Sequence, residues 1–356
     1  MSKARQLADL GSVTTRLDEV GNTDGALSNR NLIINGAMQV AQRGTSSTSV
    51  TAGYYTVDRF NFSPIATDEL AVTHSQSTTV PSGQGFANSW KLEVTTAETA
   101  LAADELCILR QQIEGQNLQH LAYGTSSAKS LTLSFWVRSS LIGKYSCLFY
   151  NLDATRTNLQ SFTINTADTW EYKTITIDGD TDSGAGFDND NGGSLQVAWI
   201  FAAGTDWTGT PHTGWGAHTN TDDYAFSDQV NFIAQTGTFY ITGVQLEVGE
   251  TATPFEHRSY ADELRRCERY CYRPFVSSSG DEDAELGWPR FYSSVYGTGG
   301  TVHIEYPVTM RTNPTLTYTQ ANGTVDLDVS SYIKATLRDT NDTAFFVYNF
   351  QADAEL

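Results

Sequence analysis

Residues 131–138 read Leu-Thr-Leu-Ser-Phe-Trp-Val-Arg, and this stretch decides the fold class. Apolar and polar residues alternate along it with a period of two, until Trp136 takes a position where a polar residue is due. Because successive side chains of a strand point to opposite faces, the alternation predicts a β-strand with one apolar and one polar face. Residues 170–177, Trp-Glu-Tyr-Lys-Thr-Ile-Thr-Ile, repeat the pattern and predict a second strand of this kind.

Short strands of the same type follow one another outward from these two stretches. Residues 195–201 and 239–247 are rich in β-branched and aromatic residues, and turn-rich loops separate them from their neighbours. No helical pattern interrupts this succession. Many short strands with no helix between them predict a mostly β protein, with a jelly-roll β-sandwich at residues 29–258.

Four apolar residues of the N-terminal segment, residues 1–28, are spaced by 3, 4 and 3 positions. This is the rhythm of a coiled-coil seam, although an ordinary amphipathic helix has the same pattern over so short a stretch. If the segment is a coiled coil, these residues form a trimer interface. They are Leu10, Val13, Leu17 and Val20.

A helix is predicted from Ser259 to Cys271, because Ser259 and Asp262 have the spacing of a helix N-cap. A narrow apolar stripe follows it at spacings of 4, 3 and 4 residues, with charged residues between. Such a stripe suits either a symmetric helix bundle, and so a trimer interface, or a helix packed on the sandwich. The stripe consists of Tyr260, Leu264, Cys267 and Cys271.

Strand patterns resume after Pro274 and predict a second, smaller β-sandwich at residues 273–356. Residues 259–272 then form a linker helix between two β domains. The predicted order is an N-terminal segment, a jelly-roll sandwich, a linker helix and a C-terminal β tip.

Acidic residues outnumber basic ones by 41 to 22, which gives a formal net charge of -19. This balance repels phosphate backbones and anionic membrane surfaces, because binding to either relies on Lys and Arg. No apolar run has the roughly 20 residues needed to cross a bilayer, and no signal-peptide pattern follows the first residues. We therefore expect no nucleic-acid partner, no membrane insertion and synthesis in a cytoplasm, whereas the charge does not oppose neutral sugars.

The chain lacks the motifs of cofactor sites and of common hydrolases. Four cysteines have no zinc-site spacing and are expected to be reduced, mostly buried thiols: Cys107, Cys147, Cys267 and Cys271. Gly-x-Ser-x-Gly, phosphate-binding-loop and His-Glu-x-x-His motifs are absent from the sequence. We expect no cofactor and no enzymatic activity. A small glycan depolymerase is the enzymatic alternative, since the geometry of a carboxylate pair is not visible in a sequence.

Several long strings carry a resemblance to a known family. They are residues 31–45 (Asn-Leu-Ile-Ile-Asn-Gly-Ala-Met-Gln-Val-Ala-Gln-Arg-Gly-Thr), 55–60 (Tyr-Thr-Val-Asp-Arg-Phe), 241–249, 252–258, 260–264 and 267–270. Together they resemble the tail-fibre and minor structural proteins of tailed phages, especially phages of marine and cyanobacterial hosts. The resemblance covers roughly residues 31–272, and residues 273–356 match no family.

This resemblance implies a homotrimeric virion protein of the tail, with residues 1–28 on tail or baseplate proteins and the C-terminal tip toward the host. Its implied function is attachment to the host through a cell-surface polysaccharide. The alternative is a structural virion component without receptor binding, such as a capsid fibre or tail adaptor. The sandwich is also similar to jelly-roll carbohydrate-binding modules, which often hold calcium through acidic residues of the first and last strands. Thr242 and Gly243 stand where such modules often have an acidic pair, so the chain departs from that site.

Two groups of residues are candidates for glycan binding, because sugars bind to flat aromatic faces beside amide and carboxylate groups. The first lies in the loop at residues 204–223, whose aromatic side chains alternatively pack between subunits. The second lies in the C-terminal tip, where about half of the aromatic residues alternate along strands and belong to a core. The candidates are Trp207, Trp215 and Asp222 in the loop, and Trp288, Phe291 and Tyr292 in the tip.

Asp178, Asp180 and Asp182 have the 1, 3, 5 spacing of the carboxylates in a calcium loop. Ser183 stands at position 6, where such loops have glycine, and no helix follows. A solvated acidic hairpin loop is therefore the favoured interpretation, and a calcium site is the alternative.

Overall fold

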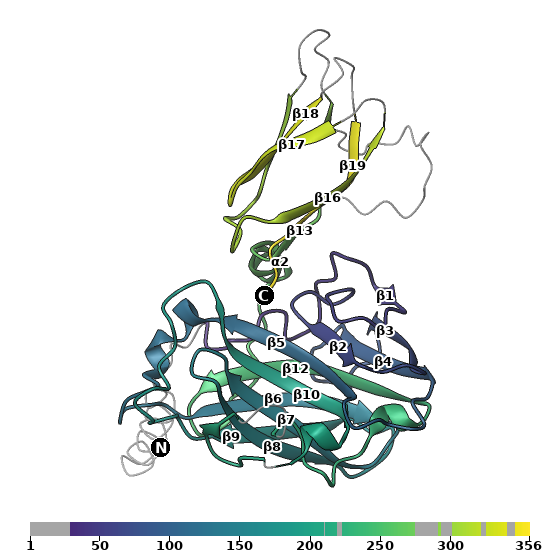
Figure 1. The fold of residues 1–356 in the computed structure, drawn as a ribbon, viewed down its shortest axis with the longest axis vertical. Helices are drawn as coiled ribbons and strands as arrows, with labels where there is room; N and C mark the ends of the chain where they lie inside the picture. Colours follow the sequence, from purple (N-terminus) through teal and green to yellow (C-terminus); the bar gives the residue numbers. More distant parts are fainter. Residues whose placement is uncertain are drawn as a thin grey trace, which may run out of the picture.

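The computed structural model describes residues 29–209, 211–218, 223–274, 291–292, 301–321, 325–339 and 346–356. Within them the chain forms a large β-sandwich that carries a smaller β domain, with helix α2 at the junction (Figure 1). The predicted fold class is confirmed. Among these residues, no helix has the length and apolar character of a membrane span. Several predicted site residues lie outside the described part: Leu10, Val13, Leu17, Val20, Asp222 and Trp288.

Two six-stranded antiparallel sheets form the sandwich. Sheet A has the order β1-β3-β4-β12-β6-β9, and its strands are β1 (Ser46–Ser47), β3 (Ala71–Ser77), β4 (Ser89–Thr96), β6 (Leu131–Ser139), β9 (Glu171–Ile177) and β12 (Gly237–Val248). Sheet B has the order β11-β8-β7-β10-β5-β2, and its strands are β2 (Asn61–Ile65), β5 (Leu106–Glu114), β7 (Gly143–Asn151), β8 (Arg156–Ile164), β10 (Gly193–Ala203) and β11 (Gly216–Ala217). Short 3-10 helices lie in the connections: η1 (Gly115–Asn117), η2 (Gln119–Leu121), η3 (Thr205–Trp207) and η4 (Phe232–Ala234).

The main core lies between the two sheets and is built as the alternation predicts. Leu131, Leu133 and Phe135 of β6 are fully buried in it, as is Val137. Trp136 stands between them in the strand, so its side chain points to the outer face of sheet A. The period-two pattern therefore identified the core face of this sheet correctly.

The strings that resemble phage proteins join the first described residues to the last strand of the sandwich. Asn31 Nδ2 donates to the carbonyl oxygen of Val244 at 3.0 Å, and Leu246 N donates to Asn31 Oδ1 at 3.1 Å. Gly36 is required here, because a Cβ at this position would lie 2.0 Å from the carbonyl oxygen of Val244. These residues close the sandwich. Their part of the resemblance is therefore explained by the needs of the fold.

Helix α2 (Tyr260–Glu268) begins at the predicted N-cap, where Ser259 Oγ accepts a hydrogen bond from Asp262 N. It ends before the predicted Cys271, which belongs to the two-residue strand β13 (Cys271–Tyr272).

The predicted apolar stripe of α2 is not one exposed surface. Cys267 and Cys271 are fully buried within the same chain, whereas Tyr260 is 57% exposed. Leu264 is partly buried. The assignment of Cys267 and Cys271 to a trimer interface is therefore wrong, because the chain itself already covers both thiols. All four cysteines are free and buried, as expected.

The C-terminal domain consists of two small sheets with a core of their own. One has the order β15-β18-β17; the other has the order β13-β19-β14, and β16 also pairs with β19. Their strands are β14 (Phe291–Tyr292), β15 (Thr301–Glu305), β16 (Thr315–Ala321), β17 (Val325–Ser330), β18 (Lys334–Asp339) and β19 (Phe346–Asp353). Ile304, Leu337 and Phe350 lie in the shared core.

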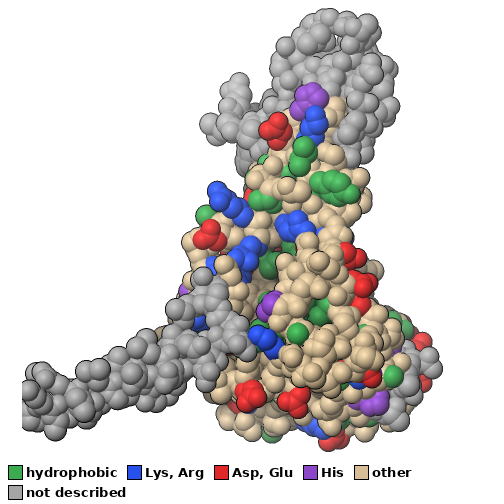
Figure 2. Space-filling model, turned by 90° about the vertical axis from the view of Figure 1, so that its left-hand side faces the viewer, with side chains coloured by type: hydrophobic (Ala, Val, Ile, Leu, Met, Phe, Trp, Pro, Cys, Tyr) green, Lys and Arg blue, Asp and Glu red, His purple; other side chains and the backbone are tan. Residues whose placement is uncertain are grey.

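The last residues of the chain turn back to the junction with the sandwich. Arg59 is 1% exposed and pairs with Glu355, and its guanidinium carbon lies 3.4 Å from the centroid of the Tyr270 ring. Arg43 pairs with Asp353 at 2.9 Å and with Glu355 at 3.2 Å. Burial alone would lower the pKa of both guanidinium groups, but the carboxylate of Glu355 raises it. Figure 2 shows Lys and Arg side chains gathered around this narrow junction.

Candidate functional site

The predicted glycan-binding loop covers the outer face of sheet B. Trp207 packs with Tyr224, at 5.2 Å between ring centroids, over an apolar cluster that is separate from the main core. The cluster consists of Leu106, Ile108, Leu148, Leu159, Ala198, Ile200, Ala203 and Ala225. Trp207 therefore has a packing role that its loop position did not predict.

Trp215 lies against the main core instead. Its Nε1 donates to the carbonyl oxygen of Asp178 at 2.8 Å, and its ring stands edge-on to Tyr123 at 5.6 Å. The structure thus does not bring Trp207 and Trp215 together in one site. In the tip, Phe291 and Tyr292 form strand β14, which pairs with β19.

The acidic loop of Asp178, Asp180 and Asp182 is held by an arginine. Asp180 is 3% exposed, and its carboxylate pairs with Arg156 Nε at 2.6 Å. Asp182 pairs with the same guanidinium group at 3.5 Å. The positive charge of Arg156 lies against both of these carboxylates, where it would repel a Ca²⁺ ion. This pairing favours the interpretation as an acidic hairpin loop over the calcium alternative.

The outer face of sheet A carries aromatic side chains that no sequence pattern assigned to a site. Trp136 of β6 and Tyr172 of β9 are cross-strand partners with ring centroids 5.3 Å apart, and Tyr172 is 44% exposed. Trp170, just before β9, lies 6.1 Å from Tyr240 of β12 between ring centroids. We call these four residues the sheet A aromatic face.

Two cations lie at the Tyr240 end of this face. The guanidinium carbon of Arg138 is 5.2 Å from the Tyr240 ring centroid, and Lys91 Nζ is 6.0 Å from it. Both are paired, Lys91 with Glu93 at 2.6 Å and Arg138 with Asp168 at 3.2 Å. The charges at the aromatic face therefore cancel locally, in contrast to the strongly acidic chain as a whole.

The loop before β9 is anchored, and this fixes the position of Trp170. Glu171 accepts hydrogen bonds from Asn165 N at 2.8 Å and Thr166 N at 2.9 Å, and Lys173 Nζ lies 2.6 Å from its carboxylate. Burial alone would raise the pKa of the Glu171 carboxyl, but these contacts lower it to about 2. The carboxylate is therefore ionised at neutral pH and holds the loop on β9.

This arrangement is suited to sugar binding. Flat rings stack against the apolar C–H faces of sugars, and Arg138 and Lys91 add hydrogen-bond donors beside them. Strands position such groups more precisely than loops do. The sequence held one signal for this site, because Trp136 breaks the alternation of residues 131–138 at an outward position.

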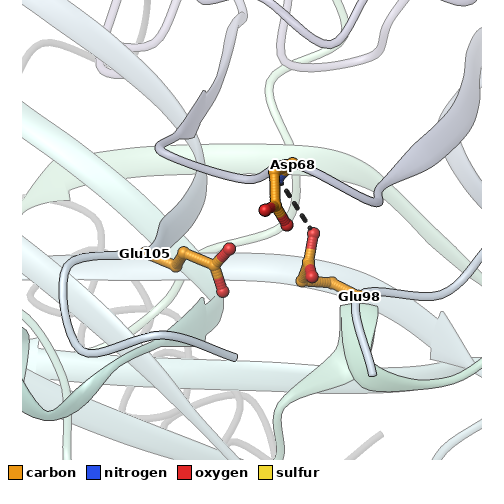
Figure 3. A group of neighbouring side chains, drawn as sticks. All are labelled: Asp68, Glu98 and Glu105. Atoms are coloured by element: carbon orange, nitrogen blue, oxygen red, sulfur yellow. Dashed lines mark hydrogen bonds between the residues drawn. The ribbon is translucent and has the colours of Figure 1, made fainter. Parts of the chain in front are cut away.

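Three carboxyl groups converge where two loops pass between the sheets (Figure 3). Asp68 lies between β2 and β3, whereas Glu98 and Glu105 lie between β4 and β5. Oxygen atoms of the three side chains lie within 4.8 Å of one another, as metal ligands do. Burial raises the pKa of the Glu105 carboxyl, and the neighbouring carboxylates of Glu98 and Asp68 raise it further.

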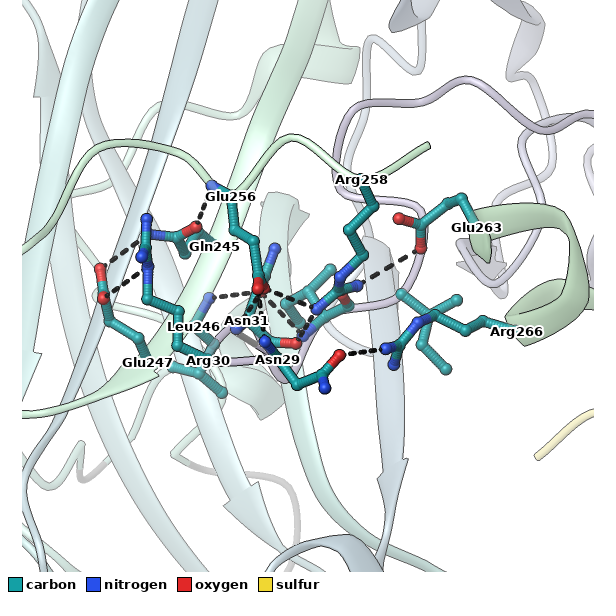
Figure 4. Close-up of polar contacts among 12 residues, drawn as sticks. Asn29, Arg30, Asn31, Gln245, Leu246, Glu247, Glu256, Arg258, Glu263 and Arg266 are labelled. Atoms are coloured by element: carbon teal, nitrogen blue, oxygen red, sulfur yellow. Dashed lines mark hydrogen bonds and ion pairs between the residues drawn. The ribbon is translucent and has the colours of Figure 1, made fainter. Parts of the chain in front are cut away.

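A depression of about 710 Å³ lies beside α2 at the junction, and arginine side chains line it. Arg258 pairs with Glu256 at 3.1 Å and with Glu263 at 3.5 Å (Figure 4). Arg266 donates to Asn29 Oδ1 at 2.6 Å. These arginines connect the first described residues to α2, so the network stabilises the junction and is not assigned to ligand binding.

Comparison with protein-family models and with curated proteins gave no match. Solved structures of similar fold include the enzymatically active domain of tailspike protein 4 of bacteriophage CBA120, which is 12% identical with a TM-score of 0.33. That match covers 62% of this chain and 22% of the tailspike chain, so this chain spans about a fifth of that protein.

Two carbohydrate-binding modules are also similar. The family 11 module of Clostridium thermocellum, solved with a β-1,3-1,4-mixed-linked tetrasaccharide, is 13% identical over 59% of this chain and 98% of that chain, with a TM-score of 0.29. The module TmCBM61, solved with β-1,4-galactotriose, is 11% identical over 62% of this chain and 100% of that chain, with a TM-score of 0.30. Identities and TM-scores this low carry no conclusion about what this chain binds.

Proposed function

We propose that this chain is a virion protein of a phage tail that attaches the particle to its host by binding a cell-surface polysaccharide on the sheet A aromatic face. The resemblance of residues 31–272 to tail-fibre and minor structural proteins supports the first part. The observation that carries the second part is the pair Trp136 and Tyr172, whose rings lie next to each other on an open strand surface.

An extended, neutral sugar chain suits this face better than a small or a charged ligand. Small ligands are usually bound in concave pockets that cover most of their surface, whereas this face is the outside of a sheet. Lys91 and Arg138 are already paired with carboxylates, and the net charge of -19 repels anionic polymers. We infer a neutral polysaccharide that is bound without being cleaved.

Affinity electrophoresis of the purified chain in gels that contain neutral polysaccharides tests this proposal. Tyr172→Ala should remove the retardation that the unaltered chain shows. Tyr332→Ala is the matched control, because Tyr332 is 50% exposed and lies in the C-terminal domain. Loss of binding in the Tyr332 variant alone would move the site to the tip and refute the proposal. Release of reducing ends during incubation would contradict binding without cleavage.

We further propose that the chain is a homotrimer attached to tail or baseplate proteins through residues 1–28. The coiled-coil spacing within that segment supports this, and Tyr260, which is 57% exposed, is available for a contact along α2. Light scattering of the full chain should give three times the mass of 39.0 kDa. A monomer at micromolar concentration would refute the trimer and leave the glycan site to its own test.

A further inference from the structure

Two arginines of the depression beside α2 form no ion pair with any described residue. Arg265 is exposed, and its side chain makes no hydrogen bond among these residues. Arg266 is half-buried, and its guanidinium group donates to the neutral amide oxygen of Asn29 at 2.6 Å. The charged residues that line the depression are four arginines and two carboxylates: Arg258, Arg265, Arg266, Arg269, Glu256 and Asp262. This surface is therefore locally basic on a chain whose net charge is -19.

Burial makes the positive charge of this surface costly. Burial and the neighbouring charge of Arg258 lower the pKa of Arg266, so both disfavour the charged form of its guanidinium group. The side chain of Arg258 is 7% exposed, and its buried Nε has no hydrogen-bond partner among the described residues. Guanidinium groups form strong, fork-shaped hydrogen bonds with carboxylates. The depression therefore favours an acidic partner over a neutral one.

Exposed apolar side chains stand beside the arginines on both domains. Tyr260, at the start of α2, is 57% exposed, and Ile333, in the turn between β17 and β18, is 58% exposed. Tyr306 N donates to the carbonyl oxygen of Ile333 at 2.9 Å, two residues before Val308, which belongs to the lining of the depression. Figure 2 shows hydrophobic side chains next to the Lys and Arg side chains of the junction. Arginine and aromatic residues together are typical of protein–protein interfaces.

Exposed acids without a basic partner among the described residues lie at the same junction. Asp188 and Asp190 stand in the loop before β10, and Asp188 N donates to the carboxylate of Asp153, in the β7–β8 connection, at 2.9 Å. We call Asp153, Asp188 and Asp190 the acidic junction patch. Its loop is fixed to the tip, because Arg311 Nη1 donates to the carbonyl oxygen of Asn191 at 3.0 Å.

The acidic junction patch and the arginine depression are separate surfaces at one end of the sandwich. Arg311 joins them, because its backbone N donates to the carbonyl oxygen of Arg269, a lining residue of the depression, at 2.8 Å. No residue of the patch is among the described lining residues. Both surfaces thus lie where the sandwich carries the tip, and each has the charge that the other lacks.

We infer that the arginine depression of one copy binds the acidic junction patch of a second copy of this chain. This inference rests on the proposed homotrimer. Two copies do not join through their arginine depressions alone, because like charges repel. A contact between two different surfaces of identical copies is head-to-tail and can close into a ring. Copies placed side by side around an axis that follows the tip bring this end of one sandwich against the same end of the next.

Charge reversal of the full chain tests the contact. Arg265→Glu and Asp188→Lys each reverse an exposed charge whose side chain makes no hydrogen bond or ion pair among the described residues, so both variants should fold. Each should raise the Kd between copies about tenfold in sedimentation equilibrium, and the chain with both substitutions should recover most of the affinity. Asp206→Lys is the matched control, because Asp206 is exposed and follows the opposite end of β10. An unchanged Kd in Arg265→Glu, or no recovery in the doubly substituted chain, would overturn the inference.

A zero-length cross-link locates the contact independently of affinity. Arg265→Lys keeps the positive charge and provides an amine, which a carbodiimide joins to a carboxylate in contact with it. Cross-linked dimers from a denaturing gel should contain a peptide that joins position 265 to the acidic junction patch, and the monomer band should lack it. A trimer in light scattering without this peptide would overturn the inference and leave the homotrimer standing. A monomer would overturn both.

Discussion

The two outer faces of the sandwich carry similar aromatic residues but differ in what covers them. On sheet B, Trp207 and Tyr224 lie over an apolar cluster that includes Ile200, so the chain itself covers this face. On sheet A, Trp136 and Tyr172 lie on the outer surface, and Tyr172 keeps 44% of its surface exposed. One face is completed within the chain, and the other is open to a partner.

The difference between the two faces shows which aromatic residues are good candidates for ligand contact. The outward positions of sheet B are apolar, as Leu106 and Ile108 show, and therefore require a cover. The outward positions of sheet A are mostly polar, so the rings of Trp136 and Tyr172 are not needed to cover an apolar cluster there. Exposed aromatic residues that no fold requirement explains are the better candidates for ligand contact.

Removing the cover of sheet B should have the largest effect. Trp207→Ala combined with Tyr224→Ala is expected to lower the free energy of unfolding by about 4 kcal/mol, because each buried aromatic side chain contributes about 3–5 kcal/mol and these two are less than fully buried. Urea denaturation measures the change. Polysaccharide binding at low urea should stay the same. A loss of binding with little loss of stability would show that sheet B holds the ligand.

Trp136→Ala should give the opposite result. The Kd for the polysaccharide is expected to rise about thirtyfold, or about 2 kcal/mol, because a central stacking ring is removed. The free energy of unfolding should change by less than about 1 kcal/mol, since the ring lies outside the core. Trp136→Phe retains an aromatic ring and should recover most of the affinity. A large loss of stability at unchanged Kd would remove the distinction between the two faces.

The fold class was predictable because strand geometry imposes a period of two on any half-buried strand. Residues 131–138 and 170–177 became β6 and β9, which are neighbours in sheet A. The N-cap at Ser259 was predictable for a similar reason, because it depends only on residues three positions apart. The end of α2 could not be predicted from nearby residues. Cys271 pairs with Asp353 of β19, and no pattern around the helix indicates a partner so distant in sequence.

The sites depended on contacts between distant residues, and sequence patterns missed them for that reason. The spacing of Asp178, Asp180 and Asp182 suggested calcium, but Arg156 of strand β8 pairs with two of these carboxylates. The loop residue Trp207 resembled a binding residue until strands of sheet B were found beneath it. The carboxylates that do converge come from two separate loops and have no characteristic spacing.

Arg138→Ala should have an intermediate effect on sheet A. Arg138 Nε donates to the carbonyl oxygen of Asp168 at 2.8 Å and so holds the loop that carries Trp170. We expect the Kd to rise about fivefold, because Trp170 loses its fixed position and Tyr240 loses its cation. Added salt should change the Kd of the unaltered chain less than about twofold, since the charges here are paired. A steep salt dependence would instead indicate an anionic ligand.

The smallest expected effect concerns protonation of Glu171. Its pKa is about 2 in the folded chain against a usual 4.5, so its contribution to stability is complete above pH 4.5 and is lost as the pH falls toward 2. The NMR signal of the Trp170 indole should therefore stay constant from about pH 6 to pH 4. Lys173→Met removes the nearest cation, so the pKa of Glu171 rises and the transition should move to higher pH, whereas Glu171→Gln should show none. A transition near pH 4.5 in the unaltered chain would mean that the loop is not anchored, and the open face of sheet A would then lack the preformed geometry that the proposed glycan site requires.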